Sequence, residues 1–537
     1  MPDPFGFEEF RGNFFVSNNA TKSLMRNTRV STLAWGWGLV MNVTRSIMLI
    51  EFFNDVEMGL WFLAFDFMGY FVVSNFGIAN AFIKYTAECN AKKEYSRLSE
   101  LLSTGMVFSL SLGILVLAVL FFFSDFIVSF FSLSESPDAR FVLWGIGFTT
   151  ALNIGFSVYN GTLTGVHRID IKNWIRVSVL TVEILTMTLL LNIGYGVRMV
   201  IVLYVIGVIL TTLLARHFVF KNLPNIKINP FHARRSRLRE IVSFGGKMQL
   251  LGVVALVVTT FDTMVFARYG GLAFLGVYGP AKRLAKRAQG AAQQGFGALA
   301  PASADLIARG EWKELSGIYL TAMRLTAVGC MWIFAFLIVN ADWAIQFQFE
   351  EESTPFVVFI FAALCAAFYV HALTGPGSSM LRGAGMPFRE MAYQLLVIVI
   401  FLSLFYFAIK TDDNRYIAVT WPIARGGASL VFLMMANRFF KVKFFTPFFQ
   451  TLPLLIAIAL SAYGLRSILD WAHLPLPESR WVAFSYMLVT GIVYSGFCGL
   501  AAFFVPGLSQ ADKERIARFL PGGSILIESY RSRRRTS

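Results

Sequence analysis

Four cations stand within six residues of one apolar stretch, and their spacing is the first sign of chemistry in this chain. Lys282, Arg283, Lys286 and Arg287 lie in the segment 272–302, which has the length of a membrane span. A cation near the centre of a bilayer costs roughly 2.5–3.5 kcal/mol on insertion scales. This segment therefore cannot face lipid, and we expect it to face protein or a water-filled cavity.

On a helix, the polar residues of this segment share one face. They recur at spacings of three and four: Gly279, Arg283, Lys286, Arg287, Gly290, Gln293, Gln294 and Gly297. Such a cationic row would bind phosphate or an acidic sugar. The glycines beside it would let a bulky ligand approach the backbone. The alternative is an amphipathic helix that only lies on the membrane surface.

Other ionisable residues interrupt apolar segments elsewhere. We expect substrate binding by Arg45, Tyr70, Arg283, Lys286, Arg287, Gln294 and Arg425, and coupling or counter-charge roles for Asp66, Glu183 and Asp262. Arg45 and Asp262 could form a gate across a cleft, or could simply neutralise each other within one state. Glu183 has no clear partner in the sequence. His371 is more often a packed histidine than a proton relay.

The composition indicates a membrane protein with many spans. Of 537 residues, 56% are hydrophobic and only 15% charged, and the mean hydropathy is +0.61. Apolar runs of about 20 residues recur along most of the chain, which is typical of helical spans rather than of an outer-membrane barrel. In a soluble protein the net charge of +15 would suggest nucleic acid. Here the basic residues are better explained as topology signals, and we expect no nucleic-acid partner.

Fourteen apolar segments are candidate transmembrane helices in an all-α polytopic fold. They lie near 31–51, 58–83, 104–124, 141–164, 177–195, 198–215, 244–266, 272–302, 319–340, 355–376, 390–409, 416–437, 452–470 and 482–505. The N-terminal segment, every second connection and the C-terminal segment hold 32 of the 47 Lys and Arg residues, whereas the opposite connections hold 5. This asymmetry predicts that both termini are cytoplasmic.

An internal repeat predicts two pseudo-symmetric six-helix lobes with a cleft between them. Residues 94–99 (EYSRLS) and 311–316 (EWKELS) match at an offset of 217, as do Gly59 and Gly276. Residues 163–165 and 381–383 match at an offset of 218. Chance similarity of apolar sequence is the competing explanation.

The repeat sets the expected organisation of the chain. It comprises a cytoplasmic segment 1–30, a first lobe 31–215, a basic linker 216–243, a second lobe 244–437, two further helices in 452–505 and a basic tail 506–537.

The sequence contains none of the common catalytic motifs. The chain has no P-loop, no GxSxG and no zinc-ligand spacing, and its four cysteines are far apart. We therefore expect no enzymatic activity, no cofactor and no metal. Energy would come from an ion gradient, the membrane potential or the substrate gradient.

Several stretches resemble the polysaccharide biosynthesis, Wzx-like flippases. They are 59–61 (GLW), 75–81 (NFGIANA), 92–95 (KKEY), 163–168 (LTGVHR) and 275–284 (LGVYGPAKRL), and the resemblance covers roughly 31–437. The wider superfamily of multidrug, oligosaccharidyl-lipid and polysaccharide exporters also holds the lipid II flippase. Two further C-terminal helices are a feature of its lipid-handling members.

The resemblance implies a two-lobed bundle in the bacterial inner membrane that alternates between inward- and outward-open states. Its substrate would be an undecaprenyl-pyrophosphate-linked oligosaccharide, and a polymerase or glycosyltransferases of the same pathway would be its partners. Two rival functions stay open. One is an ion-coupled exporter of small organic compounds, and the other is a membrane scaffold of a polymer synthase that flips nothing itself.

Overall fold

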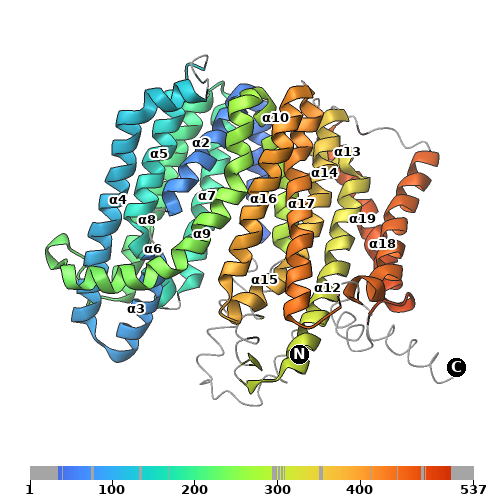
Figure 1. Ribbon diagram of the computed structural model, residues 1–537. Helices are drawn as coiled ribbons and strands as arrows, with labels where there is room; N and C mark the ends of the chain where they lie inside the picture. Colours follow the sequence, from blue (N-terminus) through green and yellow to red (C-terminus); the bar gives the residue numbers. More distant parts are fainter. Residues whose placement is uncertain are drawn as a thin grey trace, which may run out of the picture. The chain divides into compact units, whose positions relative to one another are not determined.

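The regular structure of the chain is helical, as the sequence predicts. The computed structural model describes residues 40–73, 78–131, 136–166, 168–292, 309–349, 355–411, 413–443, 446–472 and 479–508, with a few single positions between these ranges. Within these residues every regular element is a helix (Figure 1). The all-α fold class is therefore confirmed.

The described helices belong to two compact units, one within residues 15–279 and the other within 280–537. After a helical stretch at 40–52, the first unit contains α2 (Asp55–Val73), α3 (Ile78–Lys92), α4 (Tyr95–Phe130), α5 (Ala139–Gly155), α6 (Ser157–Gly165), α7 (Ile169–Asn192), α8 (Val197–Asn222), the 3-10 helix η3 (Pro230–His232) and α9 (Arg235–Tyr269). The division falls inside α10 (Gly271–Ala292), between Gly279 and Pro280.

The second unit continues from α10 through the C-terminal helices. Its elements are α12 (Trp312–Val339), α13 (Ala341–Phe349), α14 (Pro355–Ala372), α15 (Thr374–Gly383), α16 (Pro387–Ala408), η6 (Ile409–Thr411), α17 (Asn414–Phe439), α18 (Thr446–Trp471) and α19 (Arg480–Phe504). The expected lobes, linker and tail were drawn from the repeat and the loop charges, and they stay predictions.

Length and composition identify the helices that could cross a membrane. Within the described residues nine helices qualify, or ten if α5 and α6, which are bent by 41°, form one span. The helix α10 is not among them because it carries four cations in six residues. The chain is thus a multi-pass membrane protein, and the count of fourteen spans stays a prediction.

The repeat found in the sequence has a counterpart in the backbone geometry. Glu94 precedes α4 with φ −83° and ψ 60°, and Glu311 precedes α12 with the same two angles. The residues before them, Lys93 and Gly310, both have positive φ, at 59° and 75°. Each glutamate N–H donates to the carbonyl five residues earlier at 2.9 Å. Chance similarity of apolar sequence does not explain a turn reproduced in this detail.

A second turn is duplicated at the other offset. The N–H of Arg168 donates to the carbonyl of Leu163 at 2.9 Å, and the N–H of Met386 donates to that of Leu381 at 2.9 Å. These pairs are 218 residues apart, like the sequence match at 163–165 and 381–383. Both turns therefore support a duplication.

Helices α2 and α10 cross at the two glycines that the repeat pairs. A Cβ atom on Gly59 would lie 2.0 Å from the carbonyl oxygen of Leu272, and one on Gly276 would lie 2.2 Å from that of Asp55. Because 55 and 272 are also 217 apart, the two contacts are related by the repeat. The glycine of each helix contacts the backbone of the other helix, and this reciprocal arrangement is typical of a twofold interface. Small residues allow this close approach of helices in a membrane.

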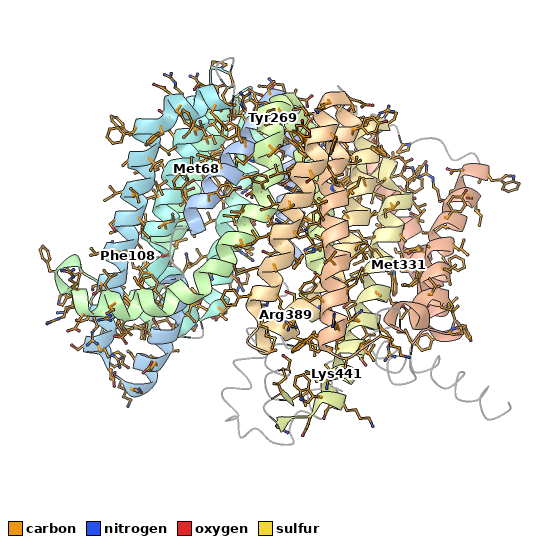
Figure 2. All side chains as sticks on the ribbon, in the orientation of Figure 1. Met68, Phe108, Tyr269, Met331, Arg389 and Lys441 are labelled. Carbon is orange, nitrogen blue, oxygen red and sulfur yellow. The ribbon has the colours of Figure 1, made fainter. Side chains whose placement is uncertain are left out.

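One end of the second unit carries basic side chains over aromatic rings. The Cζ of Arg389 lies 4.8 Å from the centre of the Phe439 ring, and the Nζ of Lys441 lies 5.6 Å from that of Trp312. Figure 2 shows Arg389 and Lys441 at the same end of this unit. Rings and cations of this kind suit the boundary between membrane and water. Both cations belong to connections that we expect in the cytoplasm.

We expect Gly276→Ala to destabilise the purified protein, because its Cβ would overlap backbone that cannot move aside cheaply. Overpacking of this kind typically costs about 1–3 kcal/mol. Gly290→Ala on the same helix is the matched control, since nothing lies within 4 Å of a Cβ there. Thermal unfolding in detergent should show a lower Tm for Gly276→Ala only. Equal Tm values for the two variants would contradict the close crossing.

Candidate functional site

The second unit gathers basic side chains around one tryptophan, and we call Lys282, His371, Trp421 and Arg425 the Trp421 cluster. The Nζ of Lys282 lies 5.6 Å from the centre of the Trp421 ring, and the Cζ of Arg425 lies 5.7 Å from it. Lys282 and Arg425 are each 7% exposed. Cations over an aromatic face are stabilised by its quadrupole. The cluster thus holds two positive charges in the interior of a membrane protein.

His371 from α14 fixes the position of Arg425 from α17. The Nη2 of Arg425 lies 2.7 Å from the Nε2 of His371, and the Nδ1 of His371 lies 3.3 Å from the hydroxyl of Ser429. Because a guanidinium can only donate, Nε2 must accept. The ring is therefore neutral, with its proton on Nδ1, and it donates to Ser429. The expected packed histidine is thus also a positioning residue for a cation.

The remaining cations of α10 lie within a helix, as predicted. Lys286 is exposed, whereas Arg283 and Arg287 are partly buried, and the charge of Lys286 acts on His371. Gln294 lies outside the described residues, so its predicted contribution is not tested. The prediction that Gly279 leaves room for a ligand is wrong, because a Cβ there would lie 2.5 Å from the ring of Phe62. Gly279 serves helix packing instead.

A second group of predicted residues meets in the first unit. Tyr278 is fully buried and donates to the Oδ2 of Asp262, also fully buried, at 2.7 Å. The charges of Asp66 and Asp262 act on the hydroxyls of both Tyr70 and Tyr278. Helices α2, α9 and α10 thus bring two carboxylates and two phenols into one electrostatic neighbourhood. Such a group can hold a proton or balance a cation.

Arg45 pairs with Glu183, which differs from the gate considered from the sequence. The Nη2 of Arg45 lies 2.7 Å from the Oε1 of Glu183, and both side chains are mostly buried. Arg45 therefore does not pair with Asp262 in this conformation. The sequence could not reveal this partner, because the two residues are far apart in the chain and outside the repeat pattern.

Small and aromatic residues enclose this ion pair. A Cβ on Gly207 would lie 2.9 Å from the Oε2 of Glu183, so the glycine leaves room for the carboxylate. The charges of Arg45 and Glu183 both act on the Tyr204 hydroxyl, and the Tyr204 ring lies 5.1 Å from that of Phe65. A pair in such surroundings is shielded from water and cannot be broken cheaply.

Several residues of these groups were not predicted from the sequence. Trp421 stands one helical turn before Arg425, a spacing that places a ring beside a cation and could have been noticed. Tyr278 and Ser429 had no such signal in the sequence, because each contacts a residue of a different helix. Tyr278 contacts Asp262 of α9, and Ser429 contacts His371 of α14. Lys282 was not among the predicted substrate-binding residues, yet it is more deeply buried than Lys286.

We expect Glu183→Gln to destabilise the protein by about 3 kcal/mol, because it leaves the positive charge of Arg45 buried without its partner. The double variant Arg45→Met/Glu183→Met removes both charges and should recover most of that loss. Thermal unfolding of the purified variants measures both effects. A double variant less stable than Glu183→Gln would mean that the pair is not the main stabilising contact at this place.

The role of His371 can be separated from its packing. His371→Gln retains an acceptor for Arg425, whereas His371→Phe removes it. We expect inorganic pyrophosphate to bind about tenfold more weakly to the Phe variant, as for a lost hydrogen bond to a charged group. The readout is the part of the tryptophan fluorescence change that disappears in Trp421→Phe. If the Gln and Phe variants bind alike at equal Tm, His371 does not position Arg425.

Solved structures of membrane transporters have a similar fold. The lipid II flippase MurJ in an inward closed conformation matches with TM-score 0.66 and 14% identity, covering 87% of this chain and 97% of its own. An inward-facing MATE family multidrug resistance transporter of the MOP superfamily matches with TM-score 0.65 and 15% identity, covering 75% and 94%. A MOP superfamily transporter from Pyrococcus furiosus gives 0.50 and 14%, covering 78% and 96%. At these identities the likeness establishes the fold alone.

Sequence comparison identifies the family directly. No curated protein matches the chain. The family model described as polysaccharide biosynthesis protein matches residues 24–307, which is more than half of the chain. The resemblance stated from residues 59–61, 75–81 and 275–284 is thereby confirmed. The chain belongs to the polysaccharide biosynthesis protein family, and its fold is that of the MOP superfamily transporters.

Proposed function

We propose that the protein translocates a lipid-linked oligosaccharide across the bacterial inner membrane by alternating access, with both termini in the cytoplasm. The observation that carries this proposal is the Trp421 cluster, which keeps Lys282 and Arg425 buried beside one ring. Buried cations in a membrane protein are costly, and they mark the path of a substrate of opposite charge. The membership in a polysaccharide biosynthesis family favours a glycan substrate.

The anionic part of the substrate follows from the donors. An arginine binds phosphate oxygens through two parallel N–H groups, and a lysine adds a compact charge. A pyrophosphate or an acidic sugar suits Arg425 and Lys282 together, while the lipid tail would stay in the bilayer. Arg283, Lys286 and Arg287 would extend the same binding along α10. At other stages of translocation the substrate is proposed to contact Arg45, Tyr70 and Gln294.

The acidic residues are proposed to balance or couple these charges. Asp66 and Asp262 neighbour two tyrosine hydroxyls, and Glu183 is paired with Arg45. A carboxylate whose partner changes during transport can bind and release a proton or a cation. This is the means by which a gradient would drive the cycle. Glycosyltransferases or a polymerase of the same pathway are the proposed partners on either side of the step.

We expect Arg283→Ala/Arg287→Ala to abolish polymer export while the protein level stays normal, because the anion loses two charged donors. Each charged hydrogen bond contributes about 1.5–3 kcal/mol, so the purified variant should flip labelled lipid-linked oligosaccharide in liposomes more than tenfold more slowly. Lys410→Ala/Arg415→Ala removes the same charge from an exposed connection and is the control.

The outcomes separate the rival functions. Full export by the α10 variant would remove the cationic track from the mechanism. If the wild-type protein flips nothing in liposomes but is needed for polymer synthesis in cells, it is a scaffold and not a flippase. If it instead exports cationic dyes against a gradient, it is an exporter of small organic compounds.

A further inference from the structure

The connection between α8 and α9 is bound to the body of the first unit instead of forming a free linker. The hydroxyls of Ser99, Ser103 and Thr104 on α4 accept the backbone N–H groups of Lys227, Asn229 and Arg234 at 3.0, 3.0 and 2.9 Å. These three backbone donors would otherwise need water. The connection therefore keeps one fixed path across the end of α4.

Ion pairs hold the same connection from one side. Glu100 on α4 pairs with Arg234 and Arg237, each at 3.1 Å. Glu240 pairs with Arg97 at 2.9 Å and with Arg237 at 3.4 Å. The hydroxyl of Tyr85 donates to the carbonyl of Glu240 at 3.2 Å. These contacts orient the first turns of α9 and decide which of its side chains face the protein.

The connection and the start of α9 also carry an exposed phenyl ring and three exposed cations that none of these ion pairs includes, and we call Lys227, Phe231, Arg235 and Arg239 the basic face. Phe231 is 94% exposed, and the three cations are exposed as well. Arg235 and Arg239 are four residues apart on α9 and so lie one above the other. They are neither of the two arginines that Glu100 binds.

The place of the basic face relative to the membrane follows from helix lengths. The spanning helix α8 ends at Asn222, only five residues before Lys227. Helix α9 has 35 residues, whereas roughly 20 suffice to cross the hydrocarbon. Its first turns carry Arg235, Arg237, Arg239 and Glu240, a charge density that keeps them outside the hydrocarbon. Figure 1 shows them running across the ends of the neighbouring helices of this unit rather than alongside them.

We propose that the basic face is a binding site for anionic phospholipid headgroups of the leaflet on its side of the membrane. Lys227 follows the spanning helix α8 by only five residues, and charges near a bilayer surface are attracted by anionic lipid over a Debye length of about 8 Å at physiological salt. A basic segment next to a spanning helix is attracted by anionic lipid. A single exposed ring beside the cations suits insertion at the headgroup level. One ring is too small an apolar surface for a stable protein interface, which favours lipid over a protein partner.

The binding site would connect lipid composition to the transporter itself. Because the connection is hydrogen-bonded to α4 and ion-paired to α4 and α9, a headgroup bound on the basic face restrains the cytoplasmic beginning of α9. The same helix carries Asp262 toward its other end. Anionic lipid would thus stabilise one arrangement of α9 within the first unit. This inference does not depend on the identity of the transported substrate.

The test measures which lipids the full-length protein retains. Native mass spectrometry from micelles containing phosphatidylglycerol and phosphatidylcholine should show preferential retention of phosphatidylglycerol. Arg235→Gln/Arg239→Gln should reduce this preference about tenfold, in line with the attraction of each basic residue to anionic membranes. Lys410→Gln/Arg415→Gln removes two exposed cations elsewhere and should retain the wild-type preference.

Two further measurements keep the test decisive. Hydrogen exchange of residues 225–240 in nanodiscs should slow when phosphatidylglycerol replaces a quarter of the phosphatidylcholine, and Phe231→Ser should weaken this protection. The Tm in phosphatidylcholine should be the same for Arg235→Gln/Arg239→Gln and wild type, because the pairs to Glu100 and Glu240 remain. Equal lipid preference in wild type and this variant would overturn the proposal. If the variant also loses binding to an acidic protein while its lipid preference is unchanged, the basic face binds a protein partner and not lipid.

Discussion

A charge that enters the hydrocarbon region must be surrounded by protein, and this requirement shapes both units of the chain. Arg45 meets Glu183 at 2.7 Å in the first unit, with Gly207 leaving room for the carboxylate. In the second unit Arg425 meets a neutral imidazole and an indole ring. The first contact joins two opposite charges, whereas the second surrounds a cation with an imidazole and a ring.

His371 holds Arg425 through a neutral imidazole, whose Nε2 accepts from the guanidinium. A carboxylate in its place would hold the guanidinium as firmly, but would also cancel its charge. An imidazole accepts one hydrogen bond and passes a second to Ser429. The cluster thus fixes the direction of the guanidinium through a chain of two contacts, from Arg425 to His371 and from His371 to Ser429.

Duplication explains how one chain builds such surroundings twice. The turns at Glu94 and Glu311 share their backbone angles, and the contacts of Gly59 and Gly276 are related by the same offset. The polar side chains do not follow the repeat. The cations gather around Trp421, while the acidic residues gather around Tyr278. The repeated backbone segments thus carry different polar side chains.

The sequence by itself determined the helical class, the membrane location, the family and the repeat, because these depend on local composition and on spacing along the chain. Apolar runs of about 20 residues predict spans without any knowledge of packing. The four cations of 282–287 likewise predict, from composition alone, a segment that cannot face lipid. The count of fourteen spans stays a prediction, because it includes 272–302, whose helix α10 is too polar to qualify as a span by composition.

Only the tertiary structure decided which charges meet. Glu183 pairs with Arg45, 138 residues away in the sequence, and His371 contacts Arg425, 54 residues away. The ring of Phe62 packs against Gly279, where the sequence suggested open space. The backbone of 227–234 is fixed by hydroxyls of α4 that have no periodic signature. Contacts of this kind depend on how helices rotate about their axes and on which side chains fill the space between them. Hydropathy and residue spacing do not determine that rotation, so the partner of each charged side chain is defined only by the packing of the helices.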